Sequence, residues 1–472
     1  MFGMSKKFGM MGGFAGMQME TIAAISTAQG QGGIGIVRVS GESAISIVDR
    51  LFVAVSGRTL AETPGYTARF GKIFDQGEEL DEAVVLVFRA PHSYTGEDVV
   101  EISCHGGLYV TKRVLSAVLS GGASVAEPGE FTRRAFLNGK MDLIKAESVM
   151  KIIEASGKSA ARAAVAVNDG AVSRKIASVN ADLVGLSAQL AVWADYPDDA
   201  DFDADFSSIK EILSQAEEQL ARLVRDYDTG KVLVNGVNTA IIGAPNVGKS
   251  TLMNLLVGSE RSIVTDVPGT TRDIVEETVV VGGITLRISD TAGIHATSDL
   301  VEAIGVDRAR GRLATADLVI FVFDGSRSLT DGEFDLLNSI KENNNVLGVV
   351  NKSDLEPVLN IDYLKKFVKD VVKISAKTGV GAEELEKSVL KMLEVAQVDP
   401  SEGILVSERQ FFSVKKALES VREALSVLEN GLTLDAVTVS INSAIDELLV
   451  LTGEKATQVV VDEVFSKFCV GK

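Results

Sequence analysis

Short runs of apolar residues, separated by turn-forming residues, dominate the first third of the chain. The clearest runs are TIAAIST (21–27), GIGIVRVS (33–40), AVVLVF (83–88) and VVEIS (99–103). Runs of four to eight residues rich in Val and Ile between turn signals are typical of β-strands. The pattern therefore predicts a compact α+β unit over residues 19–138.

The spacing of apolar residues changes to a helical period after residue 139. Residues Ile209, Leu213, Ala216, Leu220 and Leu223 repeat at intervals of three and four, which predicts one apolar face of a helix. A second stripe of the same kind near the chain end consists of Val414, Leu418, Val421, Leu425 and Leu428. We therefore expect helical sequence over 139–232 and again over 398–472.

Between these helical regions, apolar strands alternate with helical stretches. The strand candidates are NTAIIG (238–243), TLRIS (285–289), LVIFVF (318–323) and VLGVV (346–350). Strands that alternate with helices predict a parallel sheet of βαβ units. We thus expect an α/β domain over 233–397, inserted into one discontinuous helical domain, and a disordered leader over 1–18.

Composition narrows the class of protein. The 472 residues carry 47 Lys and Arg against 65 Asp and Glu, a net charge of −18, which disfavours indiscriminate binding of nucleic acid. A membrane span needs about 18 to 20 consecutive apolar residues, and we find no such run. Two cysteines, Cys104 and Cys469, cannot form a disulfide scaffold. We expect a soluble, cytoplasmic protein with no membrane partner.

The segment GAPNVGKS, Gly243 to Ser250, matches the phosphate-binding loop of nucleotide-binding proteins. It follows a predicted strand and opens a predicted helix, which is the context that the motif requires. Backbone N–H groups would hold the phosphates, Lys249 would reach the outer phosphates, and the hydroxyl of Ser250 would bind Mg²⁺. The expected contacts with nucleotide from this loop are Asn246, Val247, Gly248, Lys249, Ser250 and Thr251.

Four further motifs follow in the order found in Ras-like GTP-binding domains. TDVPGTTRD (265–273) offers Thr271 to Mg²⁺, DTAG (290–293) offers Asp290 and Gly293 near the γ-phosphate, and Asp354 of NKSD (351–354) can accept two hydrogen bonds from guanine. SAK (375–377) adds a loop over the base. Each motif is weak alone, but the five together predict GTP binding. The further expected residues are Thr265, Asp266, Val267, Pro268, Gly269, Thr270, Thr271, Asp290, Thr291, Ala292, Gly293, Asn351, Lys352, Asp354, Ser375, Ala376 and Lys377.

The residue after DTAG bears on the mechanism of hydrolysis. Ras-like proteins have a glutamine there that orients the attacking water, whereas this chain has Ile294. Glu302 is one candidate replacement, although the residues alone favour interpreting it as an ordinary solvated helix carboxylate. No arginine finger can be assigned. A monovalent cation held by Asn246 and carbonyls of 265–270 would supply the missing positive charge.

Three segments outside the GTP motifs add a family resemblance. PHSYTGEDVVEISCHGG (91–107), EPGEFTRRAFLNGKMDL (127–143) and the terminal CVGK (469–472), with the GTP motifs, resemble the MnmE (TrmE) family of tRNA modification GTPases from Met19 to Lys472. The resemblance implies a homodimer that forms a heterotetramer with the flavoprotein MnmG. It also implies addition of a carboxymethylaminomethyl or aminomethyl group to carbon 5 of the wobble uridine of tRNA, which is contacted mainly through that complex.

The resemblance also implies ligands and site residues. The N-terminal domain is expected to bind 5-formyl-tetrahydrofolate or another one-carbon tetrahydrofolate through Arg38, Glu101, Lys140 and Lys472. The family further implies K⁺-dependent hydrolysis with water oriented by Glu302, and it implies K⁺ ligands at Asn246, Thr265, Val267 and Thr270. Cys469 is interpreted in two ways of equal weight, as a reactive thiol near the folate or as a small packed hydrophobic residue.

Other functions and sites remain open at this level. A ribosome-assembly or signalling GTPase acting as a binding switch would expect a basic RNA-binding module, so the N-terminal region and CVGK favour the modification enzyme. A folate-dependent transferase with a regulatory GTPase domain is a third hypothesis. The glycines of GQGGIG (30–35) formally match a dinucleotide-binding motif, but that motif has to open a helix and a second strand follows here, so the pattern does not indicate such a site.

Overall fold

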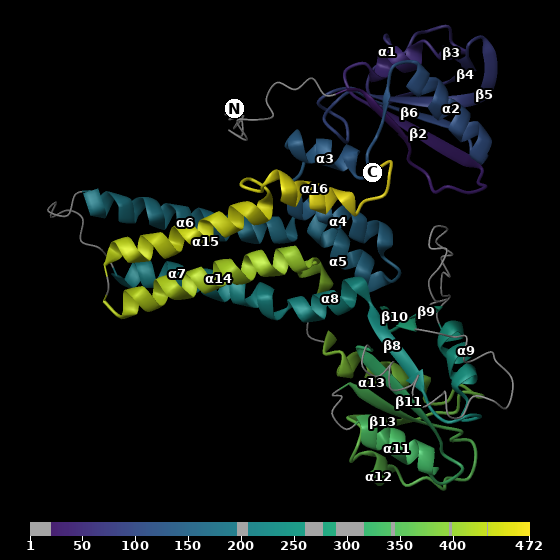
Figure 1. The fold of residues 1–472 in the computed structure, drawn as a ribbon, viewed down its shortest axis with the longest axis vertical. Helices are drawn as coiled ribbons and strands as arrows, with labels where there is room; N and C mark the ends of the chain where they lie inside the picture. Colours follow the sequence, from purple (N-terminus) through teal and green to yellow (C-terminus); the bar gives the residue numbers. More distant parts are fainter. Residues whose placement is uncertain are drawn as a thin grey trace. The chain divides into compact units, whose positions relative to one another are not determined.

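The structure, a computed structural model, describes residues 20–195, 206–259, 277–288, 316–340, 345–395, 399–431 and 433–472. The chain divides into two compact units. One comprises Met1–Met150, Asn180–Ala204 and Glu419–Lys472, and the other Lys151–Val179 and Asp205–Leu418. The elements of both units are drawn in Figure 1.

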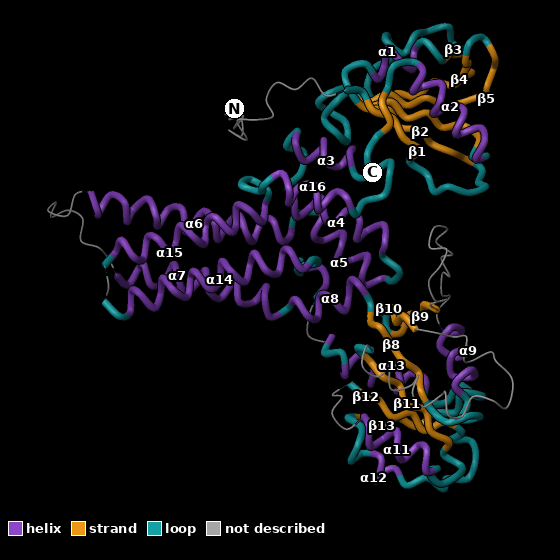
Figure 2. The backbone as a smooth tube through the Cα atoms, viewed as in Figure 1, coloured by secondary structure: helices purple, strands orange, loops and turns teal. Residues whose placement is uncertain are grey.

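The first unit is built on a seven-stranded sheet of order β3-β4-β5-β6-β2-β1-β7. Neighbouring strands are antiparallel except β1 and β7, which are parallel. The sheet is drawn in orange in Figure 2. Its strands are β1 (Ile22–Ile25), β2 (Ile34–Ser40), β3 (Phe52–Ala54), β4 (Thr67–Asp75), β5 (Glu78–Phe88), β6 (Val99–His105) and β7 (Ser124–Val125).

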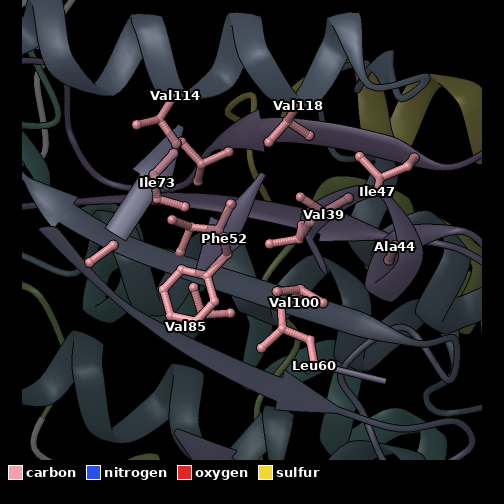
Figure 3. Close-up of a cluster of buried hydrophobic side chains, with 14 of the residues drawn as sticks. Val39, Ala44, Ile47, Phe52, Leu60, Ile73, Val85, Val100, Val114 and Val118 are labelled. Carbon is pink, nitrogen blue, oxygen red and sulfur yellow. The ribbon is translucent and has the colours of Figure 1, made fainter. Parts of the chain in front are cut away.

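Helices α1 (Ala44–Asp49) and α2 (Leu108–Ser120) contribute to the core on one face of this sheet. Figure 3 shows Val114 and Val118 of α2 beside strand residues such as Val39 and Val100. Each fully buried valine of this kind contributes roughly 1.5–3 kcal/mol to folding. Because side chains alternate along a strand, the residues between the core positions lie on the opposite face. That second face carries Arg38.

The end of the chain packs within this first unit. Helices α3 (Glu130–Leu137), α4 (Leu143–Glu154) and α16 (Gln458–Ser466) contribute to a second core that includes Phe136, Leu143 and Phe465. Helix α15 (Leu434–Thr452) precedes α16 and ends at Gly453, whose φ of +96° suits glycine. The last four residues follow α16 and therefore begin close to the start of α3.

The second unit contains a six-stranded sheet of order β13-β12-β11-β8-β10-β9. All its neighbouring strands are parallel except β9 and β10. The strands are β8 (Val237–Ile242), β9 (Glu277–Val281), β10 (Ile284–Ile288), β11 (Leu318–Asp324), β12 (Val346–Asn351) and β13 (Asp370–Lys373). The helices that follow its strands are α9 (Lys249–Ser259), α11 (Asp331–Ile340), α12 (Ile361–Leu364) and α13 (Ala382–Met392).

Helical elements join this sheet within the same unit. They are α5 (Lys158–Asn168), α7 (Phe206–Arg225), α8 (Tyr227–Asn235) and the short 3₁₀ helix η3 (Pro400–Glu402), followed by the start of α14 (Glu408–Glu429). The turn between β9 and β10 lies against the start of α5. A Cβ at Gly157 would lie 3.0 Å from the carbonyl oxygen of Gly283, which is a tight contact, so this close approach favours glycine.

Helix α6 (Ala171–Asp195) is the longest helix among the described residues. Its segment Ala171–Trp193 is also the only described helix long and apolar enough to cross a membrane by length and composition. A stripe at spacings of three and four is buried in the protein, namely Val172, Ile176, Val179, Leu183, Leu186 and Leu190. Such a stripe is typical of a helix in a bundle core.

Most elements predicted from the sequence pattern are confirmed. The four N-terminal runs form β1, β2, β5 and β6, and the four later runs form β8, β10, β11 and β12. The apolar face expected on α7 is buried at all five positions. On α14 the stripe is buried as far as Leu425, but Leu428 is only half-buried. The expected class, an N-terminal α+β domain with a discontinuous helical domain and an inserted Ras-like domain, is confirmed.

Candidate functional site

The phosphate-binding loop joins β8 to α9 in the second unit. Lys249 and Ser250 are the first two residues of α9, so the N–H groups of its first turn are directed toward the loop. Asn246 and Gly248 have positive φ values of 62° and 98°, and Val247 between them is fully buried. This backbone geometry is the one that the motif requires for a phosphate cradle.

Two glycines of the loop are required by contacts with neighbouring strands. A Cβ at Gly243 would collide with the carbonyl oxygen of Val322 on β11, and a Cβ at Gly248 would collide with the side-chain amide of Asn351. The loop therefore lies directly against two parallel strands. These contacts explain sterically why positions 243 and 248 of the motif are glycine.

Lys249 lies over the same loop. Its Nζ donates hydrogen bonds to the carbonyl oxygens of Gly243 and Ala244, both at 2.8 Å. Burial lowers the pKa of Lys249, and the negative charge of Glu333 opposes that effect in part. The ammonium is thus held at the loop where the outer phosphates would bind.

Asn351 connects three of the predicted motifs. Its Nδ2 donates to the carbonyl oxygen of Val247 at 2.8 Å, and its Oδ1 accepts from the N–H of Ala376 at 2.9 Å. The side chain is buried, so both of its hydrogen bonds are made inside the protein. Asn351 therefore holds the phosphate loop and the SAK loop in register.

Asp354 and its neighbours form the part of the site that is expected to bind the guanine base. Asp354 is exposed, and its Oδ1 accepts a hydrogen bond from Ser375 Oγ at 2.7 Å. This hydrogen bond, assisted by the charges of Lys377 and Lys352, keeps the pKa of Asp354 below its ordinary value. The ionised carboxylate can accept hydrogen bonds from a base, as the specificity for guanine requires.

Asp324 is a site residue that sequence reasoning missed. Lys352 Nζ lies 2.6 Å from Asp324 Oδ2, so this carboxylate anchors the lysine of NKSD. Burial raises the pKa of Asp324, but hydrogen bonds from Lys352 and Ser326 outweigh it and leave the pKa below its ordinary value. The sequence did contain a sign that Asp324 belongs to the site. Strand β11 is apolar and ends on this one carboxylate, at the carboxyl edge of a parallel sheet where ligands bind.

Several predicted residues lie outside the described residues. These are Thr265, Asp266, Val267, Pro268, Gly269, Thr270, Thr271, Asp290, Thr291, Ala292, Gly293 and Glu302. Their expected contacts with nucleotide, Mg²⁺, K⁺ and water remain predictions.

A second set of charged residues lies in the first unit, on the sheet face opposite α1 and α2. Arg38 on β2 is directly paired in register with Glu101 on β6. Its Nε and Nη2 lie 2.9 and 2.8 Å from Glu101 Oε1, and both side chains are largely buried. Hydrogen bonds between ionised groups of this kind are roughly twice as strong as neutral ones.

The chain end reaches this pair. Arg38 Nη1 donates to the carbonyl oxygen of Gly471 at 3.4 Å, and Ser26 Oγ donates to the same oxygen at 3.1 Å. Burial lowers the pKa of Lys472, the charge of Arg38 lowers it further, and the charge of Glu101 raises it. The structure therefore brings Arg38, Glu101 and Lys472 together within one chain.

Lys140 lies near this site without joining it. Its Nζ donates to the carbonyl oxygen of Pro91 at 2.9 Å. Pro91 belongs to the loop that carries Tyr94, whose ring contacts Arg38. Within the described part of the chain, no hydrogen bond or ion pair joins Lys140 to Arg38, Glu101 or Lys472.

Two family descriptions match this chain. GTP-binding protein TrmE N-terminus matches residues 21–140, and the MnmE helical domain matches residues 143–469. Curated tRNA modification GTPases MnmE are similar over nearly the whole length. The one from Thermoanaerobacter pseudethanolicus is 41% identical over 97% of this chain and 100% of its own. The one from Clostridioides difficile is 38% identical over 96% of this chain and 99% of its own.

The chain belongs to the MnmE family of tRNA modification GTPases. It is accordingly a GTPase that binds GTP and Mg²⁺, and its phosphate loop and guanine-side residues fit these ligands. Among solved structures, Era in complex with MgGDPNP and nucleotides 1506–1542 of 16S ribosomal RNA is 30% identical and covers 39% of this chain and 66% of that chain. Its TM-score is 0.27, so this match describes neither the fold nor the activity of the whole chain.

The terminal CVGK, one of the segments that carried the MnmE resemblance, is held by backbone contacts. The N–H of Gly129 donates to the carbonyl oxygen of Cys469 at 3.4 Å. Val470 forms an isolated antiparallel β-bridge with Pro128. The thiol of Cys469 is exposed, which makes its interpretation as a small packed hydrophobic residue wrong. Whether it takes part in chemistry stays a prediction.

The same MnmE-type segments contain a buried ionic network that sequence reasoning missed. Arg134 of α3 lies 3.2 Å from Glu97 and 2.7 Å from Glu130. Glu97 also accepts a hydrogen bond from Ser40 Oγ at 2.6 Å. Arg134 is buried with both carboxylates largely covered, so removing the arginine would leave two carboxylates without their cation. The network joins loop 91–98, β2 and α3 beside Arg38.

Proposed function

We propose that this chain is the GTP-hydrolysing subunit of a cytoplasmic system that modifies carbon 5 of the wobble uridine in tRNA. In this proposal it acts as a homodimer, with the flavoprotein MnmG, and uses a one-carbon unit from 5-formyl-tetrahydrofolate or a related tetrahydrofolate. Hydrolysis depends on K⁺. The observation that carries the proposal is the contact of the chain end with the Arg38–Glu101 pair, made by the carbonyl of Gly471 next to the terminal lysine.

The residues at this pair suit a reduced folate. The Glu101 carboxylate can accept hydrogen bonds from the amide and amino edge of a pterin, as Asp354 can from guanine. Arg38 and Lys472 provide cations within the same largely buried site. Lys140 lies nearby for the carboxylates of the glutamyl tail. When bound, the folate would supply the one-carbon unit, while these side chains bind and orient it.

Two further observations support the rest of the proposal. Apolar side chains are exposed on strands β3 to β5 and beside them, namely Val53, Val55, Tyr66, Phe70 and Val84. Contiguous apolar surface of this kind marks an interaction site, and a second copy of the chain is the occupant we propose. For K⁺, the support is Ile294, which cannot orient water, together with Asn246 in the phosphate loop.

Removal of Cys469 to Lys472 tests the folate part of the proposal. The truncated chain should lose at least tenfold in affinity for 5-formyl-tetrahydrofolate, because it lacks the Lys472 cation and the Gly471 carbonyl that contacts Arg38. GTP affinity should not change, because the nucleotide motifs are intact. Titration calorimetry measures both affinities, and mass spectrometry of tRNA from cells that carry only the truncated protein measures wobble modification.

Lys467→Ala is the matched control, because it removes an exposed lysine near the chain end whose partner is Glu463. It should leave folate affinity and modification unchanged. Normal wobble modification by the truncated protein would contradict the proposal and would mean that the terminus is only a surface tail.

A further inference from the structure

The guanidinium of Arg38 donates hydrogen bonds along its edges and also lies near two aromatic rings. Glu101 and the Gly471 carbonyl take its N–H groups. Its carbon lies 5.6 Å from the ring centroids of both Tyr94 and Phe131. Attraction between a cation and an aromatic face restricts the orientation of the planar guanidinium. Neither ring was singled out from the sequence.

The Tyr94 ring is itself tied in place by its hydroxyl. Tyr94 Oη and Thr132 Oγ1 lie 2.9 Å apart, and Thr132 is fully buried in α3. Burial raises the pKa of Tyr94, while Thr132 and Arg38 lower it in part, so the phenol stays protonated at neutral pH. This hydrogen bond joins the loop that precedes β6 to the helix that carries Phe131.

Phe131 is fixed in a different way. It is fully buried and packs in a small apolar cluster with Ile22, Ala24 and Ala126, against which Tyr94 also packs. Apolar packing alone therefore fixes the phenylalanine, whereas a hydrogen bond orients the tyrosine. Removal of that one hydroxyl leaves the apolar packing of the ring almost intact.

We propose that Tyr94 and Thr132 are positioning residues that fix the guanidinium of Arg38 for binding of a reduced folate. This inference rests on the proposed function. A long arginine side chain loses much rotamer freedom when it is ordered. The Tyr94–Thr132 bond imposes that order before the ligand arrives, so binding does not have to supply it.

The test is calorimetric affinity for 5-formyl-tetrahydrofolate in the full-length protein. Tyr94→Phe and Thr132→Val each remove one side of the bond and should weaken binding about tenfold. Thr132→Ser keeps a hydroxyl and should retain nearly full affinity. GTP affinity should be the same in all of them. Tyr109→Phe is the control, because it removes an exposed tyrosine hydroxyl that pairs with Arg113 in the same domain.

A double-mutant cycle separates positioning from a general structural role. If Tyr94 acts through Arg38, then Tyr94→Phe should weaken binding little further in an Arg38→Lys background. Equal losses in both backgrounds would overturn the inference, as would unchanged affinity of Tyr94→Phe with only a lower melting temperature. Absence of binding by the wild-type protein would overturn the proposed function and this inference with it. Normal wild-type binding with a normal Tyr94→Phe variant would overturn the inference alone.

Discussion

Single side chains in the nucleotide site act through hydrogen bonds that neighbouring loops impose. Asp354 is oriented by Ser375, Lys352 by Asp324, and Asn351 by two backbone groups at once. None of these partners is adjacent in sequence. The chemistry of each motif residue was predictable from its type, but the residue that orients it was not.

The replacement of Asp354 by Asn tests the specificity for guanine. Asp354→Asn replaces a carboxylate that accepts two hydrogen bonds with an amide that has one acceptor and one donor. The amide also offers Ser375 either a donor or a weaker acceptor in place of the carboxylate oxygen. The variant should lose GTP affinity by about a hundredfold or more and gain affinity for xanthosine triphosphate. Competition binding with both nucleotides measures the change. Unchanged GTP affinity would remove Asp354 from the site.

Among the elements, the turn after α16 matters most for the site around Arg38 and Glu101, because it carries Gly471 and Lys472. Four residues cross from a helical segment to β1, held by the Ser26 hydroxyl and by a backbone bridge to Pro128. Gly471 has φ of +95°, and a Cβ there would collide with the carbonyl oxygen of Ile25. The backbone geometry of the turn, and not side-chain packing, therefore places Lys472 near Arg38.

A methyl group at Gly471 should displace this turn. Gly471→Ala combines a strained φ with a steric clash, so we expect a loss of about 1–3 kcal/mol in stability of the N-terminal unit. Folate affinity should fall with it, while GTP affinity is kept. Val470→Ala is the control, because that side chain is exposed. Urea unfolding and calorimetry of both variants measure these effects, and equal behaviour of the two would refute the role of the turn.

For the whole molecule, GTP hydrolysis has to be completed by groups beyond the phosphate loop. Ile294 stands where Ras-like proteins place glutamine, so the water and the developing charge need other partners. Membership in the MnmE family establishes the GTPase. The cation and the carboxylate that complete the reaction are our prediction.

Hydrolysis should be faster in K⁺ than in Na⁺ at equal ionic strength, on the order of a hundredfold, because loss of one electrostatic stabiliser costs about that much. Glu302→Ala should slow hydrolysis in K⁺ while GTP affinity is preserved. Phosphate release under saturating GTP measures both. Equal rates in the two salts would exclude the cation, and a normal rate for the variant would return Glu302 to an ordinary surface carboxylate.

The sequence by itself determined the class of fold, eight of the strands in the two sheets and the nucleotide motifs. These features depend on local periodicity and on residues close together in the chain, such as the loop from Gly243 to Ser250. Tertiary structure alone decided which distant residues meet. Arg38 and Gly471 are 433 positions apart, and Lys352 and Asp324 are brought together by the pairing of β11 with β12. Such contacts follow from the packing of whole elements, which no local pattern encodes.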